Sequence, residues 1–315
     1  AEGRPFADGL RARGYKGVDV GKIRGEPARI FYRTFGKGDI KLCFISGMGT
    51  RGDMWFDQIN YFAKDEKYTV LVMDNRGVGQ SSTESPASLG RYTTSMMASD
   101  TFEVLDRIKW TKDVHIIGIS LGGMIGQELA LKEPSRFSSL VLISTHPGGG
   151  FIPKFGSFQG AWGILMLMVY GPSKAPYDLI KAKVDLISGP KLQADKKRID
   201  ALIERMTNKL KECGPSAHKP AGSKGQLGAA MTHSTLSRLA NIKESKIKCL
   251  VITGTHDLLV NPTHSTTLSK ELDCELIVMQ DIGHGPVFEA PAETNKAIES
   301  IVLQAQQVRV REWCS

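Results

Sequence analysis

The chain has 315 residues, 41% hydrophobic and 23% charged, so it can bury a sizeable core and belongs to neither the disordered nor the fibrous classes. Its formal net charge of +8 is spread along the sequence and accompanies no nucleic-acid-binding motif, which argues against a nucleic-acid partner. The same charge is compatible with peripheral contact with an anionic membrane and, within an intracellular profile, with a mitochondrial location.

Short apolar runs alternate with amphipathic stretches, the pattern of a mostly parallel sheet flanked by helices. The runs predicted as strands are Arg29–Thr34, Lys41–Ser46, Thr69–Met73, Val114–Ile119, Ser139–Ser144, Cys249–Thr253 and Glu275–Gln280. The segments with helical apolar spacing are Thr94–Trp110, Leu121–Lys132 and Ala292–Gln304. Because the strand runs are almost continuously hydrophobic, we expect helices to cover both faces of the sheet.

The alternation stops between about His146 and Asn241. There, an apolar helix is predicted over Ser157–Tyr170 and an amphipathic helix around Ile199–Leu210, followed by a Gly-, Pro- and Ser-rich stretch, Cys213–Gly228. We interpret this region as a helical cap inserted into an α/β core. The predicted limits are 27–147 and 242–304 for the core, 148–241 for the cap, and 1–26 and 305–315 for terminal extensions.

The most informative motif is Gly118-Ile119-Ser120-Leu121-Gly122, which lies between a predicted strand and a predicted helix. A serine on so tight a turn has a strained backbone, and glycines two residues before and after it let neighbouring segments approach. The turn presents the hydroxyl at a helix N-terminus, where negative charge is favoured. Ser120 is therefore the candidate nucleophile; the alternative is a capping serine in a Gly-rich turn.

A serine nucleophile needs a base, and the base needs a group that orients it. Asp257 follows the strand Cys249–Thr253, and His284 follows the strand Glu275–Gln280 between two glycines. Sites in open α/β sheets collect beyond the carboxyl ends of strands. The chain order Ser, Asp, His therefore predicts Ser120, Asp257 and His284 as a catalytic triad.

The other histidines are weaker candidates. His146 ends the strand after the nucleophile helix and could line a pocket, while His233 lies in the insertion and could contact substrate or cap a helix. Those assigned structural or loop positions are His115, His218, His256 and His264.

An oxyanion hole would complete the site. One donor should be the backbone N–H of Leu121, directly after the nucleophile, and the other should come from the glycine-containing loop Ser46–Gly49 after an early strand. The alternative interpretation of this loop is a flexible turn.

With these motifs assembled, the chain from Ile30 to Val302 resembles the α/β-hydrolase superfamily, in its branch of cap-bearing esterase-like and C–C-hydrolase-like enzymes. The motifs that carry the resemblance are Ser46–Gly49, Asp74–Ser81, the Ser120 turn, Gly254–Asp257, and Gly283–Pro286 with Glu289 and Pro291 after it. The resemblance implies an α/β-hydrolase fold with a helical cap, and it implies that Met48 and Leu121 provide the oxyanion N–H groups. It also implies that Asp74–Ser81 is a structural turn.

Two positions qualify the resemblance. Ser46 stands where many relatives have histidine, which bears on the second oxyanion donor. Serine at position 120, where aspartate would be expected in epoxide hydrolases and haloalkane dehalogenases, argues against those activities.

The apolar helix Ser157–Tyr170 must bury most of its surface against the core, the pocket or a lipid, and makes Trp162 a pocket candidate. We therefore expect a small-molecule substrate, a hydrophobic carboxylic ester or thioester cleaved through an acyl-enzyme. Two alternatives are a C–C bond hydrolase with the same triad, and a receptor or subunit that contacts a larger assembly through its terminal extensions.

No cofactor and no metal are expected, because the sequence has neither a metal-ligand cluster nor a Gly-rich dinucleotide fingerprint. The five cysteines include no Cys-x-x-Cys pair, and Cys43, Cys249 and Cys274 are expected to be buried free thiols. The longest apolar stretch, Ala161–Tyr170, is too short to cross a bilayer.

Overall fold

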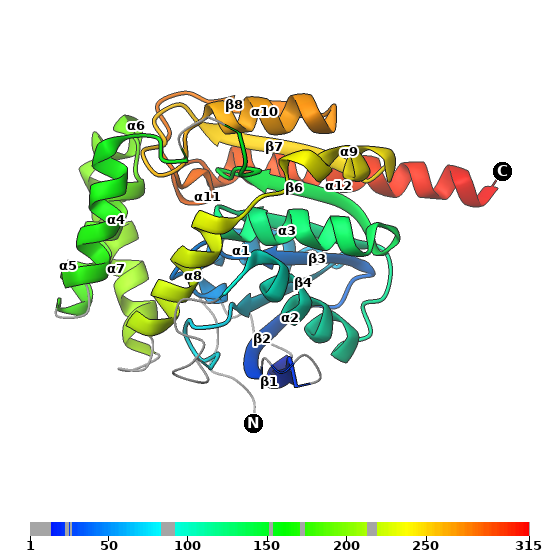
Figure 1. Ribbon diagram of the computed structural model, residues 1–315, viewed down its shortest axis with the longest axis horizontal. Coiled ribbons are helices and arrows are strands. Elements are labelled where there is room, and N and C mark those ends of the chain that lie inside the picture. The colour runs from blue at the N-terminus through cyan, green and yellow to red at the C-terminus, as the bar shows by residue number, and fades with distance from the viewer. Residues whose placement is uncertain are drawn as a thin grey trace.

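The computed structural model describes residues 14–22, 25, 27–82, 92–150, 154–170, 174–212 and 219–314, and its centre is one sheet of eight strands (Figure 1). The strands are β1 (Gly14–Val20), β2 (Ala28–Gly36), β3 (Ile40–Ile45), β4 (Tyr68–Asp74), β5 (Val114–Ile119), β6 (Phe137–Ile143), β7 (Lys248–Gly254) and β8 (Glu275–Met279). Their order is β1-β2-β4-β3-β5-β6-β7-β8. The pairs β1–β2 and β2–β4 are antiparallel and the others parallel, so the predicted mostly parallel sheet is confirmed.

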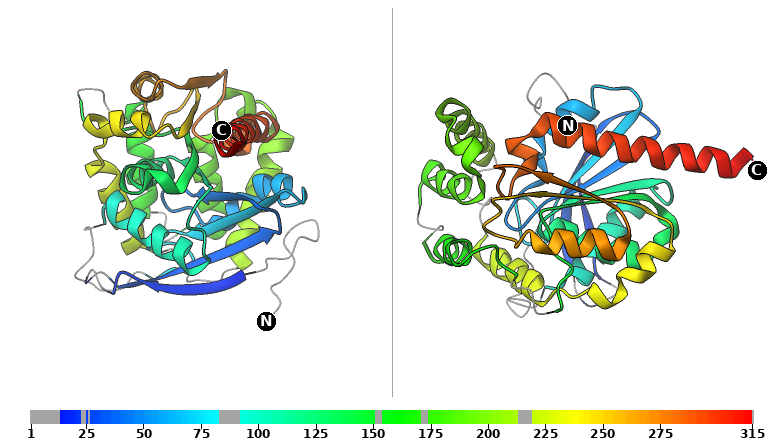
Figure 2. Two further views of the ribbon diagram at one scale, coloured as in Figure 1. Left: turned by 90° about the vertical axis from the view of Figure 1, so that its right-hand side faces the viewer. Right: turned by 90° about the horizontal axis from the view of Figure 1, so that it is seen from above.

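Helices cover both faces of the central strands (Figure 2). The helices packed with one hydrophobic cluster are α2 (Thr94–Arg107), α3 (Leu121–Lys132), α9 (Leu239–Glu244) and α10 (Thr263–Leu272). Those on the other face are α1 (Phe56–Phe62), α11 (Pro286–Glu289) and α12 (Pro291–Cys314). The two clusters divide the strands by alternate residues: Leu71 of β4 belongs to the first and Val70 to the second. This explains why the central strands are continuous apolar runs.

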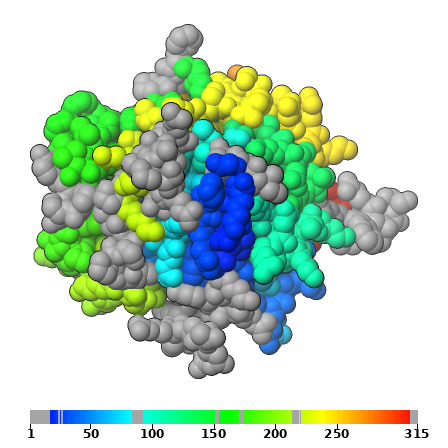
Figure 3. All heavy atoms as spheres, turned by 60° about the horizontal axis from the view of Figure 1, so that its bottom comes forward, coloured from blue at the N-terminus to red at the C-terminus, as the bar shows by residue number. Residues whose placement is uncertain are grey.

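Both edges of the sheet differ from the expectation. β1 falls in the segment predicted as a terminal extension, yet it pairs with β2 from Gly14 opposite Thr34 to Val20 opposite Ala28. Its sequence, GYKGVDV, has two glycines and two charged residues and therefore lacks an apolar run. Figure 3 shows these N-terminal strands at the molecular surface. At the other edge, Val278 of β8 is 45% exposed, so the expectation that every strand is covered on both faces is wrong there.

A helical insertion lies between β6 and β7, beyond one end of the sheet (Figure 1). Its helices are α4 (Phe158–Tyr170), α5 (Pro176–Ile187), α6 (Pro190–Gln193), α7 (Lys196–Glu212) and α8 (Pro220–Thr232). α4 and α7 were predicted, whereas α8 occupies much of the stretch interpreted as Gly-, Pro- and Ser-rich. The glycines of α8 permit close packing: a methyl group at Gly222 would lie 1.9 Å from the Gly77 carbonyl oxygen.

The remaining elements complete the core. The short 3-10 helices are η2 (Gly52–Met54), η4 (Pro134–Arg136) and η7 (Leu236–Arg238). α12 is longer than predicted and continues to Cys314, past the sheet (Figures 1 and 2). Among the helices of the described ranges, none has the length and hydrophobicity that crossing a membrane requires. Cys43 and Cys249 are buried free thiols and Cys274 is a partly buried one, whereas Cys213 and His218 lie outside the described residues.

Candidate active site

Ser120 sits on a sharp turn between β5 and α3. Its backbone has φ 54° and ψ −121°, an unfavourable conformation for a residue with a side chain. Two hydrogen bonds hold it there: the Ser120 N–H donates to the Ile143 carbonyl at 2.8 Å, and the Thr145 hydroxyl donates to the Ser120 carbonyl at 2.7 Å. Strand β6 and the residues that follow it thus stabilise the strained backbone conformation of Ser120.

The glycines around Ser120 are required by contact distances. A methyl group at Gly118 would lie 2.3 Å from the Gly122 carbonyl oxygen, and one at Gly122 would lie 2.0 Å from the Ile45 carbonyl oxygen. Both neighbours are backbone atoms that cannot move aside as a side chain can. The G-x-S-x-G spacing therefore reflects the close approach of β5, β3 and the start of α3.

Asp257 and His284 lie on the loops after β7 and β8 and face each other. The His284 Nδ1 is 2.8 Å from Asp257 Oδ2 and 3.0 Å from Oδ1, and both side chains are buried. The Leu259 and Val260 N–H groups each donate to Asp257 Oδ1 at 2.9 Å. A carboxylate at this distance requires hydrogen on Nδ1, so the neutral His284 ring keeps Nε2 free to accept a proton.

The loop Ser46–Gly49 borders Ser120: a methyl group at Gly47 would lie 3.3 Å from the Ser120 Cβ. The Trp55 indole N–H donates to the Ser46 hydroxyl at 3.0 Å, and the Asn75 side-chain amide donates to the Ser46 carbonyl at 2.9 Å. Among the described residues, nothing accepts a hydrogen bond from the Met48 or Leu121 N–H. Both residues border the same cavity as Ser120.

Ser120 and His284 line one cavity of about 200 Å³, together with Met48, Leu121 and His146. The insertion supplies much of the rest of the wall, which is largely apolar. The side chains it contributes include Ile164, Leu167, Met168, Leu186, Ile187, Met206, Leu227 and Met231. The only charged groups among the described lining residues are Lys154 and Lys183.

Residues 41–291, most of the chain, match the family described as alpha/beta hydrolase fold. The chain belongs to this family.

Proteins similar to this α/β-hydrolase include enol-lactonases and an esterase. It is 28% identical over 281 residues to 3-oxoadipate enol-lactonase 2 of Acinetobacter baylyi, an alignment covering 89% of this chain and 95% of the relative. Its structure resembles a thermophilic esterase from Thermogutta terrifontis (TM-score 0.71, 17% identity, 92% of this chain and 99% of the other). It also resembles the enol-lactonase from Burkholderia xenovorans LB400 (TM-score 0.70, 20% identity, 91% and 100%). At these identities the two structures establish the fold alone.

The three pocket candidates of the α/β-hydrolase occupy different places. His146 lines the cavity, and its Nδ1 accepts a hydrogen bond from the Gly148 N–H at 3.0 Å. Burial, with smaller contributions from His264 and Lys154, lowers the pKa of His146 to about 3, so its ring is neutral. Trp162 does not line this cavity; it is 53% exposed, stacks on Phe158 and borders a separate hollow between α4 and α5.

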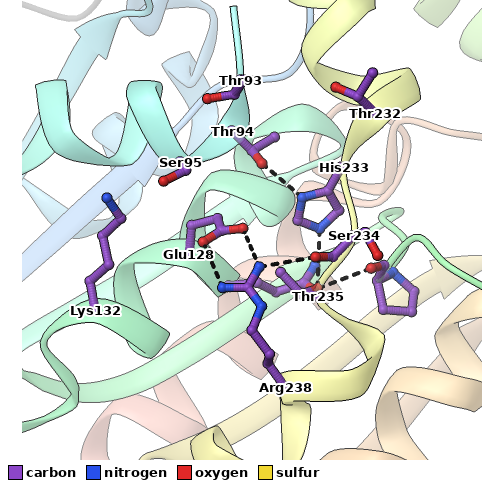
Figure 4. Close-up of polar contacts among 12 residues, drawn as sticks. Thr93, Thr94, Ser95, Glu128, Lys132, Thr232, His233, Ser234, Thr235 and Arg238 are labelled. Atoms are coloured by element: carbon purple, nitrogen blue, oxygen red, sulfur yellow. Dashed lines mark hydrogen bonds and ion pairs between the residues drawn. The ribbon is translucent and has the colours of Figure 1, made fainter.

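His233 is buried and is not among the residues that line the cavity; Figure 4 shows its polar contacts. Its Nδ1 lies 2.8 Å from the Thr94 hydroxyl and its Nε2 3.2 Å from the Thr235 hydroxyl, so both ring nitrogens are engaged. Burial lowers the pKa of His233 well below its ordinary value. Beside it, Arg238 forms an ion pair with Glu128 of α3 at 2.6 Å. In this position the ring joins the end of α8 to the start of α2.

The insertion is hydrogen-bonded to the Asp257 loop, the His284 loop and the loop Ser46–Gly49. The Ser157 N–H donates to the Leu258 carbonyl at 3.1 Å, next to Asp257. The His284 N–H donates to the Ile187 carbonyl at 2.8 Å. The Gly49 N–H, in the loop Ser46–Gly49, donates to the Gln226 side-chain carbonyl at 2.8 Å.

Two site residues were not singled out from the sequence as candidates. Glu289 is buried beneath the His284 loop and accepts hydrogen bonds from the Gly189 N–H at 2.7 Å and the Gly283 N–H at 2.9 Å. Its place just after the Gly-His-Gly-Pro motif is a usable signal. Lys183 lies on α5 next to buried Leu179, Ile180 and Val184. A lysine at helical spacing from these apolar positions could have drawn attention to it.

Proposed function

We propose that this α/β-hydrolase is a serine hydrolase that cleaves a carboxylic ester or thioester with a largely hydrophobic acyl group. The observation that carries the proposal is the placement of a strained serine and an aspartate-bound histidine on the wall of one largely apolar cavity. A lactone is a cyclic ester, so the same chemistry includes the reaction named for the Acinetobacter relative.

In the proposed mechanism, Ser120 Oγ attacks the substrate carbonyl carbon while His284 Nε2 takes the hydroxyl proton. The N–H groups of Met48 and Leu121 donate to the oxyanion of the tetrahedral intermediate. The carbon–oxygen or carbon–sulfur bond then breaks, and His284 gives its proton to the leaving group. Water attacks the acyl-enzyme with His284 again as base, and release of the acid returns the proton to Ser120.

A second candidate is hydrolysis of a carbon–carbon bond in a dienoic ketone that carries a carboxylate. The observation that favours it is the presence of Lys154 and Lys183 on the cavity wall, because such substrates need a cationic partner. Turnover of simple esters at rates well above those of a carbon–carbon substrate would favour the esterase. The opposite ranking would favour the second candidate.

The first test is labelling with a fluorophosphonate probe, followed by mapping of the modified residue. Label should appear at Ser120 in the wild type and disappear in Ser120→Ala. Ser223→Ala, which removes another serine from the cavity wall, should still be labelled at Ser120. Esters of graded chain length would then define the acyl group. Failure of a folded sample to be labelled would contradict the proposal and favour a receptor or assembly subunit.

A further inference from the structure

The cavity is electrically unbalanced. Its described lining includes the ammonium groups of Lys154 and Lys183 and no carboxylate. The Lys154 ammonium is engaged, because it donates a hydrogen bond to the Met231 carbonyl across the wall. Lys183, for which no hydrogen bond occurs among the described residues, is the less constrained of the two cations.

Lys183 projects from α5 toward the proposed oxyanion loop. A methyl group at Gly49 would lie 3.9 Å from the Lys183 Nζ, and one at Gly47 would lie 3.3 Å from the Ser120 Cβ. Two residues of extended chain span at most about 7 Å, so the loop joins hydroxyl and ammonium over a short distance. A substrate that reaches Ser120 with its carbonyl can therefore reach Lys183 with another group.

Within the part of the chain that the structure describes, no anion compensates this ammonium. Two residues earlier on the same helix, Lys181 is exposed and pairs with Asp185 at 2.6 Å. For Lys183, no partner occurs among the described residues, and burial lowers its pKa without an opposing contribution from a carboxylate. A cation partly removed from water is costly unless an anion joins it, so this ammonium favours an anionic ligand.

We propose that the Lys183 Nζ binds a carboxylate carried by the substrate, which makes the preferred substrate an anionic ester, such as the half-ester of a dicarboxylic acid or a lactone bearing a carboxylate. This inference rests on the proposed hydrolase function. In it, Lys183 determines specificity: it holds the end of the substrate opposite the scissile carbonyl. The apolar side chains that line the cavity then accommodate the connecting carbons.

The test compares matched anionic and neutral esters. The anionic probes are mono-p-nitrophenyl glutarate, with its carboxylate on the acyl side, and 4-acetoxybenzoate, with it on the leaving-group side. The neutral partners are p-nitrophenyl pentanoate and methyl 4-acetoxybenzoate. We expect wild type to prefer at least one anionic probe and Lys183→Met to lower that anionic-to-neutral ratio of kcat/KM by about 10- to 100-fold, mainly through KM.

Two variants make the comparison specific. Lys183→Arg keeps the positive charge and should restore much of the preference, whereas Lys181→Met removes a charge from the outer side of the same helix and should leave both rates unchanged. Equal anionic-to-neutral ratios in wild type and Lys183→Met for both probe pairs would overturn the inference while leaving the hydrolase function intact.

A binding measurement separates the two proposals. In Ser120→Ala, calorimetric titration with glutarate should show binding that weakens about 10- to 100-fold when Lys183→Met is added. If no ester is hydrolysed but this Lys183-dependent binding is found, the proposed function fails and the anion site stands. Absence of glutarate binding to Ser120→Ala, together with no anionic preference in wild type, would reject the site.

Discussion

Replacing Asp257 by asparagine tests how the base is oriented, because the change keeps the shape of the side chain. In the wild type, Asp257 Oδ1 accepts two backbone N–H groups at 2.9 Å, and Oδ2 lies 2.8 Å from His284 Nδ1. The asparagine oxygen must stay on the Oδ1 side, since a rotated amide would turn its NH2 toward the two backbone donors. The amide NH2 therefore faces His284 Nδ1.

That orientation of the amide favours the tautomer of His284 that cannot act as the base. The oxygen on the Oδ1 side, 3.0 Å from Nδ1 in the wild type, already accepts two backbone N–H groups, and the amide NH2 on the other side can donate only to an unprotonated Nδ1. The hydrogen of neutral His284 therefore moves to Nε2, the atom proposed to receive the Ser120 proton. Loss of this role in a triad reduces kcat by about 10⁴-fold, or about 5 kcal/mol of barrier. Stability should fall by only about 1 kcal/mol, because the two backbone bonds to Oδ1 remain.

The assay measures p-nitrophenyl ester hydrolysis and the rate of fluorophosphonate labelling, with a thermal melt of each variant. Asp281→Asn is the matched control, because Asp281 is an exposed aspartate on the loop before His284, and it should retain wild-type rates. Asp257→Asn retaining more than about a tenth of the wild-type kcat would refute the role given to Asp257. A large drop in Tm would instead mean that the Oδ1 bonds were lost.

Three further predictions concern stability. Burial lowers the pKa of His115 to about 4, so the contribution of this histidine to stability is complete above pH 6.5 and is lost as the pH falls toward 4. Between pH 6.5 and pH 5, the free energy of unfolding should therefore fall by about 2 kcal/mol more in wild type than in His115→Gln, as measured by denaturant titration. Glu289→Gln turns an amide NH2 toward a backbone N–H and should cost about 2–3 kcal/mol in denaturant unfolding; an unchanged midpoint would contradict this. Gly122→Ala should cost about 3 kcal/mol or more, since its methyl meets the Ile45 carbonyl at 2.0 Å, whereas Gly126→Ala on the same helix meets only movable side chains and should stay within about 1 kcal/mol.

The sheet interior and the candidate residues could be predicted because local sequence determines them. β5 and α3 begin and end where the apolar run and the helical spacing on either side of Ser120 predict. The loops bearing Asp257 and His284 follow from the strands that precede them. In each case the signal lies within a few residues of the feature, where periodicity and glycine spacing are informative.

The remaining features depend on partners distant in sequence. β1 is stabilised by pairing with β2 rather than by apolar residues of its own, and α8 is a helix despite its glycines because they pack on Gly77 and Tyr92. α4 is apolar nearly all round, so its sequence did not indicate that Trp162 would face outward. The assignment of Lys183 to the cavity required the packing of α5 against the loop Ser46–Gly49.

The hydrogen bonds from the insertion to three separate loops of the core affect how the insertion can move. A lid that is attached only at a hinge can open without disturbing the site beneath it. Here, displacing the insertion would break its hydrogen bonds to the Asp257 loop, the His284 loop and the loop Ser46–Gly49 together. The insertion therefore helps to hold these three loops in position. Specificity can be altered safely by exchanging side chains along the inner wall, whereas transplanting a whole foreign cap would misalign the chemistry beneath it.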